Sequence, residues 1–351
     1  MKKELEIANE LETLIRSGKL PPEAKIPSEY ELAEQYGINR KTANKAVAKL
    51  EERGLIYRTR GRGGSKVVPH LPFRGVIAYR LKLISAGVFC AQILQGAQQA
   101  ASSRNYALQY YEYELPDREH WKKIENSGIS GALYSISAPP PEDFPFPSIN
   151  VLHDFGENFV MSDDYSGGRQ AAELFLSNGH VNIAAVSNNQ GQSLNSRLSG
   201  FMDTLREAGI RTPEKRLIMI PSWEINPRAL WEEIRKMTPH VTGIFCFSDA
   251  IALQLILHLG SIGVKIPQDF SVCGFGNMRT VNNIFPITTV EQFPENLGYT
   301  ACTRLIEQIE NRTRETIRIC SPVELINARA TVGPARQAGQ VRTSRRNQSG
   351  S

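Results

Sequence analysis

Cysteine, histidine and tryptophan are scarce in this chain of 351 residues, which contains five, six and three of them. The cysteines are odd in number and lack a Cys-x-x-Cys spacing, so neither a disulfide framework nor a zinc site is indicated. No histidine has the spacing of a metal site or of a Ser/His/Asp catalytic set. We therefore expect a reduced, cytoplasmic protein without a cofactor, whose small buried thiols are Cys90, Cys246, Cys273, Cys302 and Cys320.

Long hydrophobic runs are also missing. No apolar stretch reaches the roughly 20 residues of a membrane span, and the basic N-terminus leads into an amphipathic segment instead of a signal peptide. We therefore expect no membrane partner. The net charge is only +5, but the first 70 residues hold fourteen Lys/Arg against ten Glu, and the last 17 hold four Arg and no acidic residue. Basic ends on a mildly acidic body suit a polyanionic partner.

Residues 26–68 contain two short helices with their start and stop signals. Ser28 precedes an apolar-periodic run and Glu31 follows three residues later, which is the spacing of a capping box. Gly37 is placed to end this helix. Asn39 is placed to cap the next one, in which the apolar positions recur at helical spacing at Ala43, Ala46, Val47 and Leu50. The pattern predicts a helix-turn-helix.

The second helix has the chemistry of a recognition helix. Its polar face carries cations and an amide near the N-terminus, the end that such helices place against base edges in the major groove. The strand-like segments 55–57 and 66–68 flank a stretch rich in Gly and Arg, which predicts a wing that approaches the DNA backbone or the minor groove. The DNA-binding candidates are Ser28, Tyr30, Asn39, Arg40, Lys41, Thr42, Asn44, Lys45, Arg60, Gly61, Arg62 and Gly63.

Residues 1–68 resemble the winged helix of the GntR group of bacterial regulators. The segments that carry the resemblance are Pro27-Ser28-Glu29, Leu32-Ala33, Asn39-Arg40-Lys41-Thr42, Gly54-Leu55-Ile56 and Gly61-Arg62-Gly63. The resemblance implies a domain that binds double-stranded DNA. Tyr30 and Asn44 stand where this family often has arginines, which leaves the operator sequence open.

Beyond residue 73, apolar strands alternate with amphipathic helices, which predicts doubly wound parallel sheets. There are too many strands for one compact sheet, so we expect two lobes with a ligand cleft between them. The fold class is therefore α/β, with an N-terminal winged helix-turn-helix. The expected organisation is a DNA-binding domain at 1–68, a linker at 69–72, a two-lobed effector-binding and dimerisation domain at 73–334, and a disordered basic tail at 335–351. The expected strands are 75–79, 107–111, 131–136, 148–152, 181–186, 216–220, 243–247 and 271–274.

This body is similar to the effector domain of LacI/GalR regulators, which shares the periplasmic sugar-binding fold. The similarity is carried by the segments 164–169, 178–180, 196–201, 244–249, 263–275 and 286–290. A GntR-type winged helix on such a body resembles the arabinose-responsive repressor class of bacterial regulators.

The resemblance implies that Arg197 binds the effector, because a guanidinium fork fits vicinal hydroxyls, a carboxylate or a phosphate. Ser248 and Asp249 follow a strand end, although Asp249 could instead cap the next helix. Trp223 could stack on a sugar ring or be a packed core residue, and Asp154, beside His153, lies near an expected lobe crossover. Gly276 replaces an aspartate that usually accepts bonds from sugar hydroxyls, which leaves a sugar, a sugar acid, a sugar phosphate or a non-sugar effector open.

Two functions from different classes follow. One is a ligand-responsive transcriptional regulator that binds a pseudo-palindromic operator as a homodimer, and the resemblance implies that it is a repressor. The alternative is an enzyme on a doubly wound fold with a DNA-binding appendage. An enzyme requires a nucleophile or an acid/base pair at a strand end. Because the sequence offers no such set, we predict that the protein is not an enzyme.

Overall fold

The computed structural model describes residues 3–59, 63–113, 115–135, 138–154, 156–188, 192–210, 213–221 and 225–335. The chain divides into two compact units, Met1–Gly75 and Val76–Ser351. The division follows Gly75, three residues beyond the expected linker at 69–72. Of the expected tail only Ala335 is described, and its N–H donates to the Asn178 carbonyl at 2.8 Å; residues 336–351 lie outside the described part.

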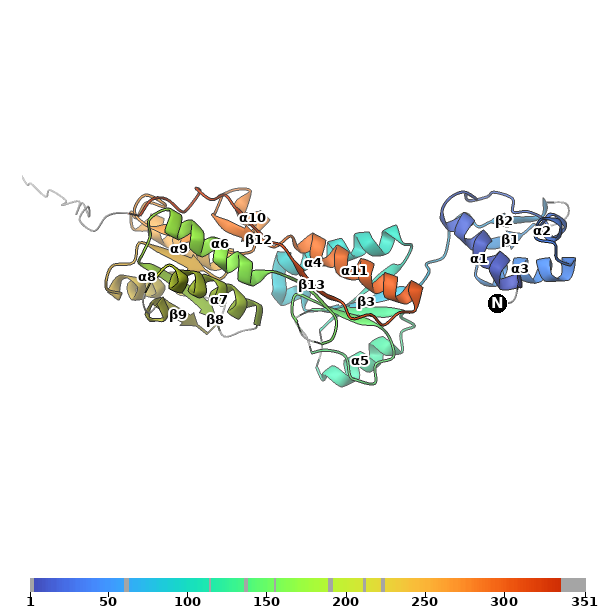
Figure 1. The fold of residues 1–351 in the computed structure, drawn as a ribbon, viewed down its shortest axis with the longest axis horizontal. Coiled ribbons are helices and arrows are strands. Elements are labelled where there is room, and N and C mark those ends of the chain that lie inside the picture. Colours follow the sequence, from blue (N-terminus) through green and yellow to red (C-terminus); the bar gives the residue numbers. More distant parts are fainter. Residues whose placement is uncertain are drawn as a thin grey trace, which may run out of the picture. The chain divides into compact units, whose positions relative to one another are not determined.

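The first unit is a winged helix-turn-helix, as predicted. Leu11, Leu32, Val47 and Leu50 lie at the centre of its buried core. The two strands pair antiparallel with Ile56 opposite Val67, and each is displaced by one residue from its predicted position. The elements are α1 (Lys3–Arg16), α2 (Glu29–Tyr36), α3 (Arg40–Glu52), β1 (Ile56–Arg58) and β2 (Ser65–Val67) (Figure 1).

The capping residues of α2 and α3 explain why these short helices start and stop where they do. The Ser28 hydroxyl accepts the Glu31 N–H at 3.3 Å, and the Glu31 carboxylate accepts the Ser28 N–H at 2.7 Å. This is the predicted capping box. Gly37 ends α2 with a left-handed φ of 60°, and the Asn39 side chain caps α3.

The second unit contains two parallel sheets, which confirms the two-lobed prediction. The first sheet has the strand order β13-β7-β6-β5-β3-β4. Helices α4 and α11 cover one of its faces, and α5 covers the other with Trp121 in its core. Its elements are β3 (Val76–Leu81), α4 (Leu83–Ser103), β4 (Ala107–Glu112), α5 (Asp117–Glu125), β5 (Gly131–Tyr134), β6 (Ser148–Val151), β7 (Phe159–Ser162), α11 (Pro294–Asn311) and β13 (Arg318–Ser321).

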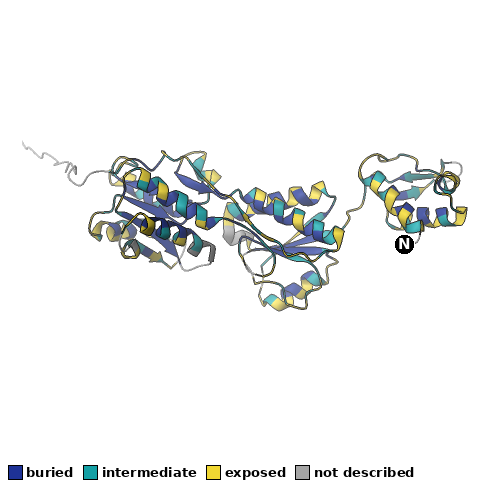
Figure 2. Ribbon diagram, in the orientation of Figure 1, coloured by how far each residue is buried: buried dark blue, intermediate teal, exposed yellow. Residues whose placement is uncertain are grey.

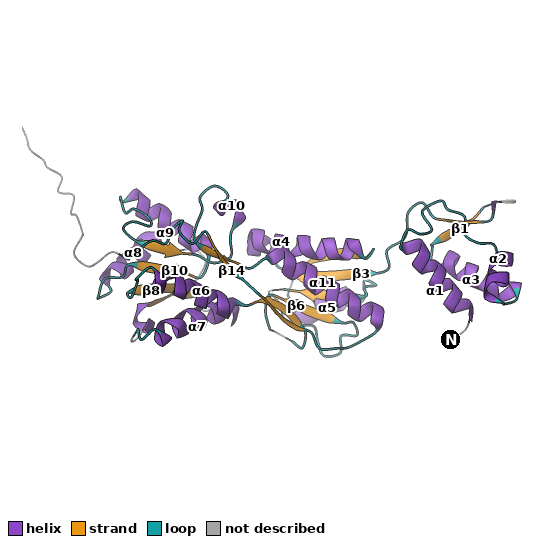
Figure 3. Ribbon diagram, turned by 45° about the horizontal axis from the view of Figure 1, so that its top comes forward, coloured by secondary structure: helices purple, strands orange, loops and turns teal. Residues whose placement is uncertain are grey.

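The second sheet has the order β11-β10-β8-β9, and its strands β11, β10 and β8 are buried on both faces. In β8, Ala184 and Val186 pack toward α8 and α9, whereas Ile183 and Ala185 pack toward α6 and α7. This two-sided burial explains the continuous apolar strands of the sequence. Figure 3 shows helices on both sides of this sheet, and in Figure 2 its inner strands are dark blue while the outer faces of the helices are yellow and teal. The elements are α6 (Asp164–Ser177), β8 (Ile183–Asn188), α7 (Gln192–Glu207), β9 (Leu217–Ile220), α8 (Pro227–Lys236), β10 (Gly243–Cys246), α9 (Asp249–Ser261), β11 (Ser271–Cys273) and α10 (Arg279–Asn282).

The chain passes between the two sheets three times. It crosses after β7, after β12 (Thr289–Glu291) and after β13, and β12 then pairs antiparallel with β14 (Glu324–Ile326). The crossings are bonded to one another: the Asp163 N–H donates to the Ser321 carbonyl at 2.8 Å, and the Gln292 amide donates to Ser162 Oγ at 2.8 Å. The crossings therefore form one hydrogen-bonded hinge.

The strand pattern predicted eight of the strands of this unit to within a few residues, but missed β7, β12, β13 and β14. These strands are only three or four residues long, and β7 and β13 carry Ser or Arg among their apolar residues. Such runs give little periodic signal, and they become strands only when other strands of the folded protein supply hydrogen-bond partners.

Four of the five cysteines are buried, but the expectation of a buried thiol is wrong for Cys320, which is exposed. Cys320 lies on β13, the edge strand of the first sheet. In the described parts of the chain, every helix is too short or too polar to span a bilayer.

Candidate functional site

The N-terminal half of α3 presents an exposed polar surface. Ala43, Ala46, Val47 and Leu50 turn inward, so the residues between them turn outward. Asn39 is committed to capping, because its Oδ1 accepts the Thr42 N–H at 2.8 Å and the Thr42 hydroxyl at 3.0 Å. The side chains left exposed on this surface are Arg40, Lys41, Asn44 and Lys45.

Two contacts link this surface to α2. The Arg40 guanidinium carbon lies 4.2 Å from the centroid of the Tyr30 ring, and its Nη1 donates to the Tyr30 hydroxyl at 2.8 Å. The Asn44 amide donates to Glu29 Oε1 at 3.2 Å. Ser28, another predicted contact, is used in the capping box of α2. Sequence reasoning proposed Tyr30, Arg40 and Asn44 separately and did not anticipate that they are paired.

The wing is described only at its base. Thr59 closes the hairpin, with its N–H and its hydroxyl both donating to the Gly64 carbonyl, at 2.9 and 2.7 Å. Gly63 is half-buried next to Thr59. The predicted contacts Arg60, Gly61 and Arg62 lie outside the described residues.

The second candidate site lies at the carboxyl ends of the parallel strands, where open α/β sheets bind ligands. Helices α6 and α7 approach closely here because Gly168 and Gly200 face one another's backbones. A Cβ at Gly168 would lie 2.0 Å from the Arg197 carbonyl oxygen, and one at Gly200 would lie 2.0 Å from the Tyr165 carbonyl oxygen. These glycines therefore set the distance from Arg197, on α7, to the start of α6.

Arg197 is a buried cation with only 8 % of its surface exposed. Its Nε donates to Asp164 Oδ2 at 2.9 Å, and its Nη1 donates to the Phe247 carbonyl at 2.9 Å. Its guanidinium carbon lies 4.0 Å from the centroid of the Phe275 ring. The arginine thus spans the ends of α6, β10 and β11, which is the location expected for an effector-binding residue.

Asp164, which sequence reasoning did not propose as a site residue, connects Arg197 to the hinge. Its Oδ1 accepts the Ser162 hydroxyl at 2.6 Å and the Gln292 amide at 3.0 Å. His153, at the end of β6, is near this pair; burial lowers the pKa of its imidazole, with the charges of Asp164, Arg197 and Asp154 acting on it as smaller influences. The sequence signal for Asp164 was its place in the 164–169 segment, directly after a strand.

Ser248 and Asp249 have structural partners, and the idea that Asp249 is a helix cap is wrong. Ser248 is the N-cap of α9, and Asp249 is the first helical residue. Asp249 Oδ2 accepts the Met278 N–H at 2.7 Å and the Asn282 amide at 3.0 Å. Burial raises the pKa of the Asp249 carboxyl. This carboxylate therefore holds the loop between β11 and α10.

The remaining effector candidates are Gly276, Asp154 and Trp223. Gly276 follows β11 with a φ of 111°, and its N–H donates to the Val290 carbonyl at 2.8 Å. Asp154 is exposed after the end of β6, and Trp223 lies outside the described residues. Among residues that the sequence did not single out, Asn150 is fully buried at the end of β6 and Ser187 at the end of β8.

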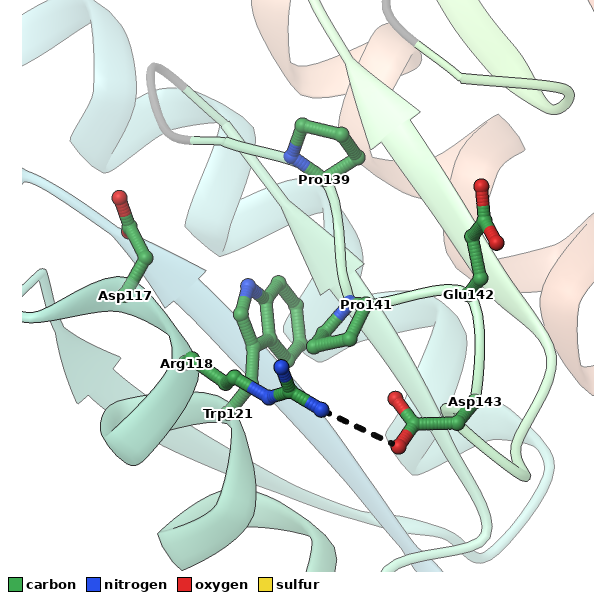
Figure 4. Close-up of a pocket in the computed structure, with 7 residues that line it drawn as sticks. All are labelled: Asp117, Arg118, Trp121, Pro139, Pro141, Glu142 and Asp143. Atoms are coloured by element: carbon green, nitrogen blue, oxygen red, sulfur yellow. Dashed lines mark ion pairs between the residues drawn. The ribbon is translucent and has the colours of Figure 1, made fainter.

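A surface pocket of about 440 Å³ lies elsewhere, between α5 and the segment 139–143 (Figure 4). Its lining includes the exposed ion pair Arg118–Asp143, at 3.7 Å, and Asp117, which binds Arg80. None of the predicted effector residues lines it. In the described parts of the chain, no cluster of three His, Cys, Asp or Glu side chains could hold a metal ion.

The comparisons with known proteins agree with this division. Residues 3–65 match the family described as bacterial regulatory proteins, gntR family, and residues 172–332 match the periplasmic binding protein-like domain. An arabinose metabolism transcriptional repressor of Halalkalibacterium halodurans is 24 % identical over 88 % of this chain and 90 % of its own length. The HTH-type transcriptional repressor PurR of Escherichia fergusonii is 24 % identical over 85 % and 91 %.

Solved structures share the fold of the body. A LacI family regulator from Enterococcus faecium with bound ribose has a TM-score of 0.65 at 24 % identity, and the match covers 74 % of this chain and all of that one. The CelR–cellobiose complex has a TM-score of 0.63 at 20 % identity, over 87 % of this chain and all of that one.

Fold and site together define a two-part protein, in which a winged helix-turn-helix precedes a two-lobed binding domain. Specifically, the chain combines a GntR-type DNA-binding domain with a periplasmic binding protein-like domain of the LacI-family fold, and its relatives are transcriptional repressors.

Proposed function

We propose that this protein is a ligand-responsive transcriptional repressor that acts in the cytoplasm, and that it is not an enzyme. The observation that carries the proposal is the combination, in one chain, of an exposed basic α3 with a polar site at the strand ends of a two-lobed body. The names of the similar repressors support it.

On the DNA side, α3 enters the major groove and the wing contacts the backbone or the minor groove. Arg40, Lys41, Asn44 and Lys45 supply the α3 contacts, while Arg60 and Arg62 supply those of the wing. Two copies bind a pseudo-palindromic operator, because a two-fold dimer presents two winged helices.

Exposed apolar side chains on α9 and after α10 support the proposal of a homodimer. Ile284 is 85 % exposed and Leu257 is 62 % exposed, with Phe285 beside Ile284 in the chain. A second copy of the chain would remove these side chains from water.

The charges at Arg197 favour a neutral effector. The arginine is already compensated by Asp164 at 2.9 Å, so an added carboxylate or phosphate would bring a second anion to a single cation. A neutral ligand rich in hydroxyls needs donors and acceptors instead. The Ser187 hydroxyl is one such group, since it is buried and has no hydrogen-bond partner among the residues that the structure describes. By strand alternation it lies on the side of the sheet that α7 covers. We therefore propose a free sugar, in preference to a sugar acid or a sugar phosphate.

The same contacts offer a route from ligand to hinge. A ligand that accepts hydrogen bonds from Arg197 changes the environment of Asp164, the ion-pair partner of this arginine. Asp164 also accepts hydrogen bonds from Ser162 and Gln292, which lie at two of the three crossings. A shift of the hinge follows only if the ligand binds the two lobe arrangements with different affinity. This difference would alter how the two winged helices of the dimer are presented to the operator.

A ligand screen on the full chain tests the proposal. Neutral sugars, sugar acids, sugar phosphates and purine bases are compared by their effect on thermal unfolding. A neutral sugar at 100 times its dissociation constant should stabilise the protein by about 2.7 kcal/mol. The same sugar should change the affinity for an operator obtained by selection from a randomised duplex pool.

Variants on α7 provide the control. Arg197→Ala should lose the sugar response, whereas Arg206→Ala, which removes an exposed arginine paired with Glu214, should retain it. A response confined to sugar phosphates would contradict the argument from charge, and an unaltered response in Arg197→Ala would place the effector elsewhere.

A further inference from the structure

The most exposed aromatic side chain of the DNA-binding unit is Tyr30, at 65 %. It is the second residue of α2, and it contacts the first residue of α3 through both its ring and its hydroxyl, as described above. An exposed tyrosine on a helix has no packing reason to lie under a guanidinium. Packing of the hydrophobic core therefore does not account for the contact between Tyr30 and Arg40.

The surroundings of Arg40 give it a fixed position. An isolated arginine at a helix start samples many rotamers, and ordering such a side chain on binding has an entropic cost. Stacking on Tyr30 restricts the guanidinium plane, and the bond from Nη1 to the hydroxyl fixes its rotation within that plane. Nε and Nη2 remain to donate elsewhere, and two parallel donors of this kind match O6 and N7 of guanine.

The neighbouring side chains are organised in the same way. Asn44 lies one helical turn beyond Arg40 and is bonded to Glu29, which is the residue before Tyr30. Glu29 Oε1 is also 3.8 Å from Arg58 Nη1, and Arg58 Nε donates to Glu51 at 2.8 Å. The first turn of α2 thus supplies a partner to each of two exposed side chains on α3.

We infer that Tyr30 is a specificity-determining residue, which positions Arg40 to read a guanine in each half-site of the operator. This inference rests on the proposed function, because it requires that α3 enter the major groove. Tyr30 acts through Arg40, so its effect belongs to one base pair per half-site, whereas a phosphate contact affects all sequences alike.

The experiment uses the full chain, and begins with selection of the wild-type operator from a randomised duplex pool. Affinities are then measured by fluorescence anisotropy at fixed salt for the selected duplex, for duplexes with single symmetric base changes, and for a random duplex. The base pair read by Arg40 is the one whose discrimination disappears in Arg40→Ala. Tyr30→Ala removes ring and hydroxyl, and Tyr30→Phe removes only the hydroxyl.

Tyr30→Ala should reduce discrimination at that same base pair by about 2–5-fold, the change that corresponds to an exposed cation–π contact. Tyr30→Phe should give a smaller reduction, and affinity for the random duplex should not change in either variant. The matched control is Tyr57→Phe on β1. It removes a hydroxyl that donates to Glu23 at 2.7 Å, and it should leave the base preference unchanged.

The outcomes distinguish a failure of the proposed function from a failure of the role assigned to Tyr30. A wild-type protein that enriches no palindrome overturns the proposed function, and the role of Tyr30 with it. A wild-type palindrome whose base preference is retained in Tyr30→Ala overturns only the role of Tyr30. Equal weakening on operator and random DNA would make Tyr30 a backbone contact, which also overturns the inference.

Discussion

At the scale of single residues, Arg197 is the side chain on which most of the second site depends. It is a buried charge whose partners all come from its own unit: Asp164, the Phe247 carbonyl and the Phe275 ring. A buried pair adds little net stability over apolar packing, but removing one member leaves the other charged, buried and uncompensated. The proposed effector contact and the stability of the unit are therefore coupled at this position.

Arg197→Ala should lower the free energy of unfolding of the second unit by about 3 kcal/mol, because Asp164 loses its cation. Urea unfolding followed by tryptophan fluorescence measures this, since all three tryptophans, Trp121, Trp223 and Trp231, belong to that unit. Arg206→Ala, on the exposed side of α7, should give no measurable change. Equal effects of the two substitutions would show that the burial of Arg197 has no energetic consequence.

Gly276 is the second informative residue, because its backbone conformation disfavours the aspartate that the resemblance to LacI/GalR effector domains led us to expect at this position. With a φ of 111°, any side chain is strained there whatever the surrounding space. Gly276→Ala should destabilise the unit by about 1–3 kcal/mol. Gly260→Ala, inside α9 with open space around the added methyl, should instead stabilise it by about 0.5–1 kcal/mol. Opposite signs in urea unfolding are expected, and stabilisation by both would contradict this.

At the scale of elements, the turns of the DNA-binding unit are specified by local chemistry. The eight-residue helix α2 is too short to be stable alone, and it depends on its caps and on Leu32 in the core. Hydrogen bonding to the Ser28 backbone N–H and side chain lowers the pKa of the Glu31 carboxyl from its usual 4.5. Because this pKa is depressed in the folded state, the associated stability is present above pH 4.5 and is lost as the pH falls through the lowered value.

The capping box gives an acid-sensitive prediction. Glu31→Gln should lower the melting temperature of the DNA-binding unit at pH 7, and the difference from the wild type should shrink as the pH falls below 4.5. Circular dichroism follows both units and tryptophan fluorescence follows only the second, so comparing them isolates the first. Glu34→Gln, an exposed change on the same helix, serves as the control. A difference that persists unchanged into acid would rule out an ionised cap.

Ser28→Ala tests the other half of the same motif. Loss of the hydroxyl acceptor should destabilise the unit by about 1 kcal/mol at neutral pH. If the turn before α3 is loosened, the affinity for the operator should fall as well. An unchanged circular dichroism transition in Ser28→Ala would contradict the role of the cap.

At the scale of the whole molecule, the proposed dimer joins the two sites, because an operator with two half-sites responds to the arrangement of both chains. Ile284→Asp should convert dimer to monomer in sedimentation velocity and weaken operator binding, because it places a charge in a proposed apolar contact. Val181→Asp makes the same change at an apolar residue that is 59 % exposed elsewhere on the unit. It should leave both properties unchanged; a dimer that persists in Ile284→Asp would place the interface elsewhere.

The sequence by itself determined what depends on short-range chemistry. Capping residues at Ser28 and Asn39, the left-handed Gly37 and the inward stripe of α3 act within a few residues, so their spacing alone predicted the helix-turn-helix. Two-sided burial likewise makes the first four residues of β8 apolar without interruption, and strand segments of this kind predicted the parallel sheets.

Only the tertiary structure decided which side chains are partners. Asp249 binds a loop 29 residues later in the chain, and Gln292 reaches Asp164 across 128 residues. The Arg40 guanidinium lies over the Tyr30 ring because two helices meet, and neither residue type predicts the other as its partner. The short strand β13 forms because it can pair with the edge of β7. In this pairing Arg318 lies opposite Phe159, which is 159 residues earlier in the chain. Contacts of this kind depend on chain segments brought together by folding, and local patterning carries no information about them.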